Sequence, residues 1–220
     1  MQLARFDFRL ATADDFDVAM EFMKSVYVTH SPLYKAMDFD DSDVEVYMKP
    51  VVKKCLASKF SVLVFEKATG ELIGIRLISL WHRPSSLCHS ESLLHMPLKL
   101  LSFADMMESF KAAFWGLCPR GVTTVMRREF SCVRRDFQRR GIGSRMADVF
   151  LGEKHLKAIG IDGIMSETSS IANQNLLAKK GFRPLSALYY GRCLDTNGNR
   201  IVPRDFHDGS NRVVLNFKEF

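Results

Sequence analysis

The sequence predicts an α/β protein in which a mixed β-sheet carries helices on both faces. Two observations support this prediction. In the first half of the chain, strand patterns at 60–66 and 71–81 are close enough to form a hairpin. In the second half, strand patterns alternate with helix patterns. The chain has 220 residues, 47% apolar and 25% charged, so we expect one domain over 1–220 with a substantial core.

The chain begins with a strand followed by a helix. Residues 5–10 alternate polar and apolar side chains, as a half-buried strand does. Thr12 and Asp15 have the spacing of a capping box, and the apolar positions that follow repeat at helical spacing as far as Tyr27. We therefore predict a helix directly after the first strand.

A second helix is predicted before the hairpin. Ser42 and Glu45 repeat the capping-box spacing, and helical periodicity continues to about Ala57. Between the two helices, residues 30–34 are not expected to be regular helix, because Pro32 restricts the residue before it.

The remaining elements follow from turn residues and periodicity. Residues 82–97 lack periodicity and contain two prolines, so we expect a surface loop. Glycines end the predicted helices of the second half. We predict helices at 98–117, 141–159 and 171–180, and strands at 123–135, 161–167, 185–193 and 213–218.

Charge and cysteine content exclude several classes of protein. The formal net charge is +6, but the arginines concentrate in 127–145, which indicates a local anion site. Aromatic residues within this cluster are few, so we expect no nucleic-acid partner. No stretch is long and apolar enough to cross a bilayer, so we expect a cytoplasmic protein without a membrane partner. No disulfide or metal site is expected, because five cysteines lie far apart, at Cys55, Cys88, Cys118, Cys132 and Cys193.

The most informative segment is DFQRRGIGSRM, residues 136–146. It joins a predicted strand to a predicted helix, where unpaired N–H groups and glycines let phosphate groups approach the backbone. Arg139 and Arg140 add positive charge. The segment does not match the dinucleotide-binding pattern, since Met146 replaces its third glycine, and it lacks the Gly-Lys-Ser/Thr of a P-loop. The alternative is a glycine turn that only begins a helix.

The order strand, QRRGIG, helix, strand, short helix and KKGF resembles the GNAT acetyltransferase superfamily over about 123–194. Within it, the chain resembles the arylalkylamine N-acetyltransferase-like branch known from insects and nematodes. The residues that carry this second resemblance are His82-Arg83-Pro84-Ser85, Thr168-Ser169-Ser170, the strand and turn from Tyr190 to Gly198, and His207.

The resemblance implies a central, twisted, mostly antiparallel sheet of six to seven strands. It also implies acetyl-CoA as co-substrate, without a metal. Residues 130–133 would part from the neighbouring strand and pair with the pantetheine arm, and the Val133 N–H would bind the thioester carbonyl. Asn173 lies on the short helix, where a plain surface amide is the alternative. The implied cofactor-binding residues are Cys132, Val133, Gln138, Arg139, Arg140, Gly141, Ile142, Gly143, Ser144 and Asn173.

The position of the usual catalytic acid differs from the superfamily pattern. Many members of the superfamily place a tyrosine four residues before the Gly-Phe pair, but Leu177 stands there in this chain. In the arylalkylamine-type branch a serine ahead of the short helix is implied instead, which is Ser169 or Ser170. Helix capping is the alternative role for these serines.

The position of the usual catalytic base also differs from the pattern of the branch. The branch uses a glutamate after the first helix, and Ser31 occupies the aligned position. His30 beside it offers an imidazole, a common general base, and Glu129 on the long strand offers a carboxylate that would act through water. The alternatives are a surface histidine and a glutamate paired with a neighbouring arginine.

The resemblance leads to one main function and several alternatives. The chain would be a transferase that acetylates the primary amine of a small arylalkylamine, as a monomer or homodimer. Tyr34, Met37 and Phe39 are candidate walls of the amine pocket, near an acidic run from Asp38 to Glu45 that would attract a cation. Core packing and a solvated face are the alternatives for these residues. Other functions left open are a polyamine or protein lysine acetyltransferase, or CoA binding without catalysis.

Overall fold

The computed structural model describes residues 2–83 and 96–220 and contains a seven-stranded sheet of order β1-β2-β3-β4-β5-β7-β6. Only β4 and β5 run parallel, and every other neighbouring pair is antiparallel. The predicted mixed, mostly antiparallel sheet is thus confirmed. The strands are β1 (Phe6–Leu10), β2 (Val62–Glu66), β3 (Leu72–His82), β4 (Thr124–Val133), β5 (Gly163–Thr168), β6 (Arg183–Tyr189) and β7 (Arg212–Glu219).

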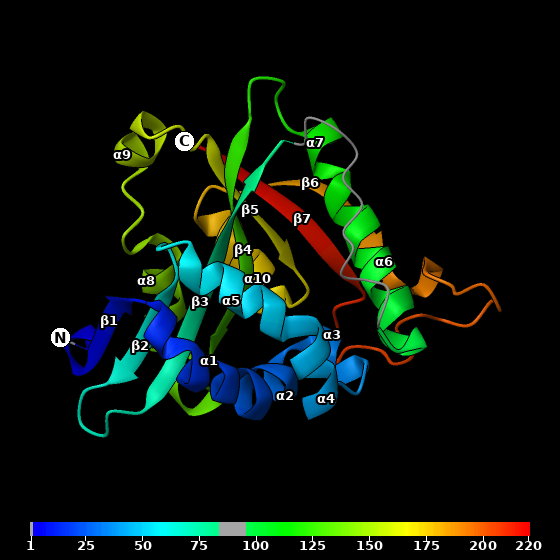
Figure 1. Ribbon diagram of the computed structural model, residues 1–220, viewed down its shortest axis with the longest axis horizontal. Coiled ribbons are helices and arrows are strands. Elements are labelled where there is room, and N and C mark those ends of the chain that lie inside the picture. Colours follow the sequence, from blue (N-terminus) through cyan, green and yellow to red (C-terminus); the bar gives the residue numbers. More distant parts are fainter. Residues whose placement is uncertain (1, 84–95) are drawn as a thin grey trace.

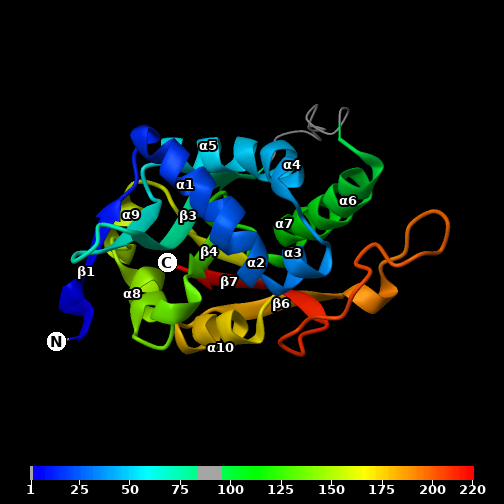
Figure 2. The same cartoon turned by 90° about the horizontal axis from the view of Figure 1, so that it is seen from below.

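Helices cover both faces of the sheet, giving three layers (Figures 1 and 2). The first face carries α1 (Phe16–Phe22), α2 (Val28–His30), α3 (Pro32–Ala36), α4 (Asp41–Asp43), α5 (Lys49–Ala57), α6 (Leu98–Ala112) and α7 (Phe114–Leu117), with π-helical turns at Met23–Tyr27 and Val44–Met48. The other face carries α8 (Ile142–Asp148) and α10 (Ile171–Lys179), with α9 (Glu153–Ala158) near the edge.

The core is divided by the sheet. A large cluster fills the first face, including Met23, Val52 and Phe103. Two smaller clusters lie under α8 and around α9 and α10, centred on Ile142 and Leu177. Leu177 is therefore a core residue, fully buried, and has no polar group to offer a reaction.

The helix starts follow the predicted chemistry with one shift. The Thr12 N–H donates to Asp15 Oδ2 at 2.8 Å, as the first capping box requires. The second capping box, predicted at Ser42 and Glu45, is wrong by two residues. It lies at Asp40 and Asp43, where the Asp43 N–H donates to Asp40 Oδ1 at 2.9 Å. Ser42 also donates to Asp40, so it does not cap the helix itself.

Two backbone breaks differ from the predicted elements. The helix expected over 141–159 is interrupted, because Val149 is extended and Phe150 is left-handed (φ +59°). The carbonyls of Met146 and Val149, freed where α8 ends, accept hydrogen bonds from the buried Arg76 guanidinium. The predicted break at residues 30–34 is confined to Ser31, because Pro32 occupies the first turn of α3, where its missing N–H costs nothing.

Part of the predicted surface loop, including Pro84, Ser85 and Cys88, lies outside the described residues. Four cysteines are described, and all four carry free thiols: Cys55, Cys118, Cys132 and Cys193. Within 2–83 and 96–220, no helix is long and apolar enough to cross a membrane, and no group of three metal-ligating side chains was found there.

Candidate active site

The two parallel strands part in the middle of the sheet. Pairing between β4 and β5 covers only Val125–Arg128 against 163–166, and β4 then runs on alone to Val133. A β-bulge at Glu129 accompanies this parting, since Leu77 pairs with Phe130 and Ile78 with Arg128. The predicted separation at 130–133 is thus confirmed. It leaves backbone groups of β4 facing a gap.

A glycine turn lies beyond the far end of this gap. Gly141 is left-handed (φ +82°), and so is Arg139 (φ +58°). The first intrahelical bond of α8 runs from the Arg145 N–H to the Gly141 carbonyl at 2.9 Å, so the N–H groups of 142–144 have no acceptor within the helix. A Cβ added to Gly143 would meet Leu176 Cδ2 only at 3.7 Å, so internal packing does not require this glycine.

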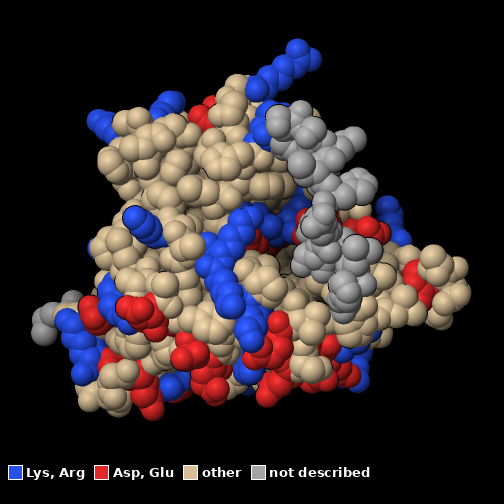
Figure 3. Space-filling view, in the orientation of Figure 1, with Lys and Arg blue, Asp and Glu red and all other residues tan. Residues whose placement is uncertain are grey.

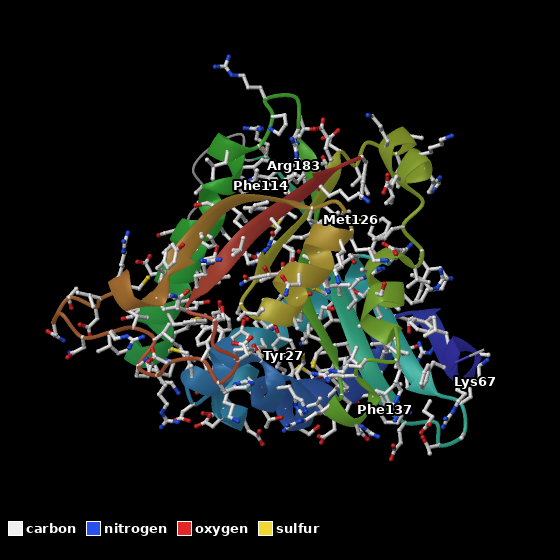
Figure 4. The ribbon with its side chains drawn as sticks, turned by 180° about the vertical axis from the view of Figure 1, so that it is seen from behind. Tyr27, Lys67, Phe114, Met126, Phe137 and Arg183 are labelled. Carbon is white, nitrogen blue, oxygen red and sulfur yellow. The ribbon has the colours of Figure 1, made fainter. Side chains whose placement is uncertain are left out.

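A cavity of about 370 Å³ connects the glycine turn with the parting of the strands. Figure 4 looks onto this face, with α8 and α10 in front of the sheet and Tyr27 and Phe137 labelled. The predicted cofactor residues that line the cavity are Cys132, Val133, Gln138, Arg139, Gly143 and Asn173. The others lie next to it: Ile142 is buried in the core, and Arg140 stacks over Phe137 at 5.0 Å.

Val133 lies near the glycine turn rather than at the parting of the strands. A Cβ on Gly143 would be 4.0 Å from Val133 Cγ2. The Arg134 N–H bonds to Ile73 on β3, so strand alternation turns the Val133 N–H towards the gap. This N–H therefore opens into the gap at the end that lies near the glycine turn.

A buried arginine supports the wall of this cavity. Arg128 is 4% exposed and donates to Asn173 Oδ1 at 3.1 Å and to Ser131 Oγ at 2.6 Å. Its Nε has no partner among the described residues. Burial lowers the pKa of Arg128 to about 10. The Asn173 amide is therefore engaged in holding Arg128 against α10 rather than exposed on the helix surface.

A second cavity, about 400 Å³, lies on the opposite face of the sheet between α5 and α6. Figure 3 shows this side of the molecule hollowed near its middle, with Lys and Arg side chains beside the hollow. The two cavities share four lining residues: Tyr27, Glu129, Glu167 and Ser169. These residues form the junction, where a group held in one cavity meets a group held in the other.

The junction is built on a buried arginine between two carboxylates. Arg127 lies 3.1 Å from both Glu129 Oε2 and Glu167 Oε2. Burial alone would lower the pKa of Arg127, but the charges of Glu129 and Glu167 raise it above its ordinary value. Glu129 Oε1 accepts a hydrogen bond from Ser79 at 2.6 Å, so both of its oxygens are engaged. Glu167 Oε1 is buried and has no partner among the described residues.

The other predicted catalytic residues are distributed around this junction. His30 lines only the first cavity, and its Nδ1 lies 2.7 Å from the Val26 carbonyl, which can only accept, so Nε2 carries the lone pair of the neutral ring. Ser31 also lines only that cavity. Ser170 caps α10 by accepting from the Asn173 N–H at 3.3 Å. Ser169 is the serine that reaches the junction.

Two junction residues were missed by the sequence reasoning. Glu167 ends the predicted short strand, and only its position beside the parting of β4 and β5 gives it a role. Tyr27 lies in a π-helical turn, a feature that is frequent at functional sites. Burial raises the pKa of Tyr27 well above its ordinary value, so this hydroxyl stays protonated.

The three side chains expected to wall an amine pocket do not line one cavity together. Tyr34 lines the second cavity, whereas Met37 and Phe39 are buried in the core outside it. Three of the five acidic residues in the run pair with basic side chains: Asp38 with Arg204, Asp43 with Lys99 and Glu45 with Lys49. The second cavity takes its aromatic walls from Tyr34, Tyr47, Trp81 and Phe130.

Solved structures share this architecture over nearly the whole chain. Arylalkylamine N-acetyltransferase 2 from Aedes aegypti superposes with a TM-score of 0.76 at 14% identity, covering 97% of this chain and 98% of its own. Drosophila melanogaster polyamine N-acetyltransferase, which forms N-acetylagmatine, gives 0.72 at 13% identity, covering 98% and 100%. Arabidopsis thaliana Naa50, in complex with a CoA bisubstrate analogue, gives 0.56 at 9% identity, covering 98% and 99%.

The chain has the GNAT fold. No family model matches the sequence, and no curated protein is similar to it in sequence. The likeness therefore lies in the three-dimensional arrangement of the chain.

Proposed function

We propose that the protein is an acetyl-CoA-dependent N-acetyltransferase that acts on the primary amine of a small arylalkylamine. One observation carries the proposal: two cavities on opposite faces of a GNAT-type sheet meet where β4 and β5 part, at Glu129, Glu167, Ser169 and Tyr27. Such an arrangement suits a reaction that brings a thioester from one side to an amine from the other.

The first cavity fits the CoA moiety. The free N–H groups at 142–144 and the positive charge of Arg139 suit a pyrophosphate, and Gly143 leaves the backbone accessible there. The edge of β4 at Ser131 and Val133 suits the amides of a pantetheine arm. When bound, acetyl-CoA supplies an activated acetyl group.

Glu167 is the general base in this proposal. The acceptor amine must lose a proton to attack a thioester, and Glu167 Oε1 is the buried, unpartnered carboxylate oxygen at the junction. Arg127 holds Glu167 through Oε2, which fixes the orientation of Oε1. Glu129 has both oxygens engaged, so it supports Arg127 rather than taking the proton.

Ser169 and Tyr27 complete the junction. Both carry hydroxyl groups that can donate a hydrogen bond to the departing thiolate, and both line the two cavities. The aromatic walls of the second cavity suit the ring of an arylalkylamine. The amine nitrogen would gain the acetyl group as the C–S bond of the thioester breaks, and its proton would pass to Glu167. A proton would pass from Glu167 through a junction hydroxyl to the thiolate, which leaves as the free CoA thiol, so the hydroxyl ends protonated.

The first experiment measures release of the free CoA thiol from acetyl-CoA with a panel of amines. The panel contains tyramine, dopamine, tryptamine, serotonin, spermidine and a lysine-rich peptide. Release with the aromatic amines alone is the expected result. Release with spermidine or the peptide alone would replace the proposal with its alternatives, a polyamine or protein lysine acetyltransferase, and binding of acetyl-CoA without release would indicate a fold that has lost catalysis.

A further inference from the structure

The acceptor cavity has an uneven distribution of charge. Its floor, which we define as the lining from strands β4 and β5, holds two carboxylates, Glu129 and Glu167, and one guanidinium, Arg127. Its wall, which we define as the lining from helices α5 and α6, holds two ammonium groups, Lys54 and Lys111, and one carboxylate, that of Glu108. One negative charge is thus in excess at the floor and one positive charge at the wall.

Lys111 is an unusual wall residue because it is 6% exposed. Its ammonium pairs with Glu108, whose side chain is 50% exposed. Burial, followed by repulsion from Arg127, lowers the pKa of Lys111 to about 8. The charges of Glu167 and Glu129 oppose this lowering, and Lys54 adds a smaller repulsion. Two lysines from opposite helices are thus close enough to repel each other.

Lys54 has no ion-pair partner among the described residues, although Lys49 on the same helix pairs with Glu45. Lys54 faces the cavity from α5 and Lys111 faces it from α6, with Trp81 and Tyr47 also in the lining. Lys54 is exposed, whereas Lys111 is buried, where a charge is favourable only when opposite charge balances it. A ligand group that pairs with Lys54 and shares Lys111 with Glu108 is anionic.

We propose that the acceptor is an arylalkylamine with an acidic group at the end remote from its amine, held by Lys111 and Lys54. The amine then lies at Glu167, where the floor carries the excess negative charge, and the ring lies against the aromatic wall. Lys111 is a specificity-determining residue that selects against diamines and polyamines. This proposal rests on the proposed function and narrows its acceptor.

Three phenethylamine probes that differ only at the ring position opposite the aminoethyl chain test the proposal: 4-(2-aminoethyl)benzoate, 2-phenylethylamine and 4-(aminomethyl)phenethylamine. Their remote ends are anionic, neutral and cationic. Dissociation constants are measured by calorimetry on the protein saturated with CoA. We expect the benzoate to bind about tenfold more tightly than the neutral probe, the scale of one charge-assisted hydrogen bond, and the diamine to bind most weakly.

Two variants and one control locate the effect. Lys111→Met should bring the three dissociation constants within about threefold of each other, and Lys54→Met, at an exposed position, should reduce the preference without a folding defect. Lys53→Met is the matched control on α5, because the Lys53 ammonium packs 5.4 Å from the Phe16 ring and does not line the cavity.

The outcomes separate this proposal from the proposed function. Equal binding of the three probes, tighter binding of the diamine, or an unchanged benzoate preference in both Lys111→Met and Lys54→Met overturns the assignment of the acidic acceptor. The same probes are then tested for acetylation. If the benzoate binds with the expected preference but no probe is acetylated, the anion subsite stands and the proposed reaction fails.

Discussion

Replacing Glu167 with glutamine tests the base at the junction. Glutamine keeps the size of the side chain and an oxygen that Arg127 can bond, but it cannot take a proton. General-base catalysis contributes about 10² to 10⁴ in rate, so we expect kcat to fall by at least about a hundredfold. Arg127 retains Glu129 at 3.1 Å, so the free energy of unfolding should fall by only about 1 to 2 kcal/mol rather than by the 3 to 5 kcal/mol of a fully broken buried pair.

Steady-state thiol release gives kcat, and calorimetry gives the dissociation constant of acetyl-CoA, which should remain within about threefold of the wild-type value. Glu129→Gln is the matched control, since both Glu129 oxygens are engaged by Arg127 and Ser79. Its kcat should fall by less than about tenfold. A Glu167→Gln enzyme that keeps its kcat, while Glu129→Gln loses a hundredfold, would refute the reasoning and make Glu129 the base.

Three further changes test other parts of the site. Gly143→Asp should abolish acetyl-CoA binding in calorimetry, because a carboxylate would occupy the anion site. Gly143→Ala should still bind acetyl-CoA, since its Cβ meets Leu176 only at 3.7 Å. Equal binding of acetyl-CoA by the two variants would contradict the anion site. Ser170→Ala removes the oxygen that caps α10 by accepting from the Asn173 N–H. In urea titration the free energy of unfolding should fall by about 1 kcal/mol, and kcat should not change. A large loss of kcat would make Ser170 catalytic. The preference for the benzoate probe over 2-phenylethylamine should be full below the pKa of Lys111, about 8, and fall as pH rises through it, because Lys111 then loses the charge that binds the anion. A preference independent of pH would contradict this role.

The sheet was predictable from the sequence because its signals are local. Alternation at 5–10 and the hairpin patterns mark individual strands, and the glycine turn after the long strand marks the parting of β4 and β5 through the resemblance that it carries. The break after α8 was not predictable, because 141–159 has helical periodicity throughout. That helix ends where the buried Arg76, far away in sequence, bonds the carbonyls of Met146 and Val149.

The catalytic residues were less predictable, because the role of each carboxylate depends on which of its oxygens already accepts a hydrogen bond or forms an ion pair. Glu129 and Glu167 look alike in sequence, and only the hydrogen bond from Ser79 and the ion pairs with Arg127 distinguish them. In the same way, Ser169 and Ser170 are adjacent, and the structure assigns the helix cap to Ser170. Lys111 carries no sequence signal beyond its position near the end of a helix.

The most direct test of the account follows a single turnover. The protein, in excess over acetyl-CoA labelled in its acetyl group, is mixed with an aromatic amine, and the label is located by mass spectrometry. We predict that the label appears on the amine nitrogen in step with release of one CoA thiol, and that Glu167→Gln slows both together. Thiol release without acetylated amine, or bound acetyl-CoA that stays intact with every amine, would contradict acetyl transfer at the junction of the two cavities.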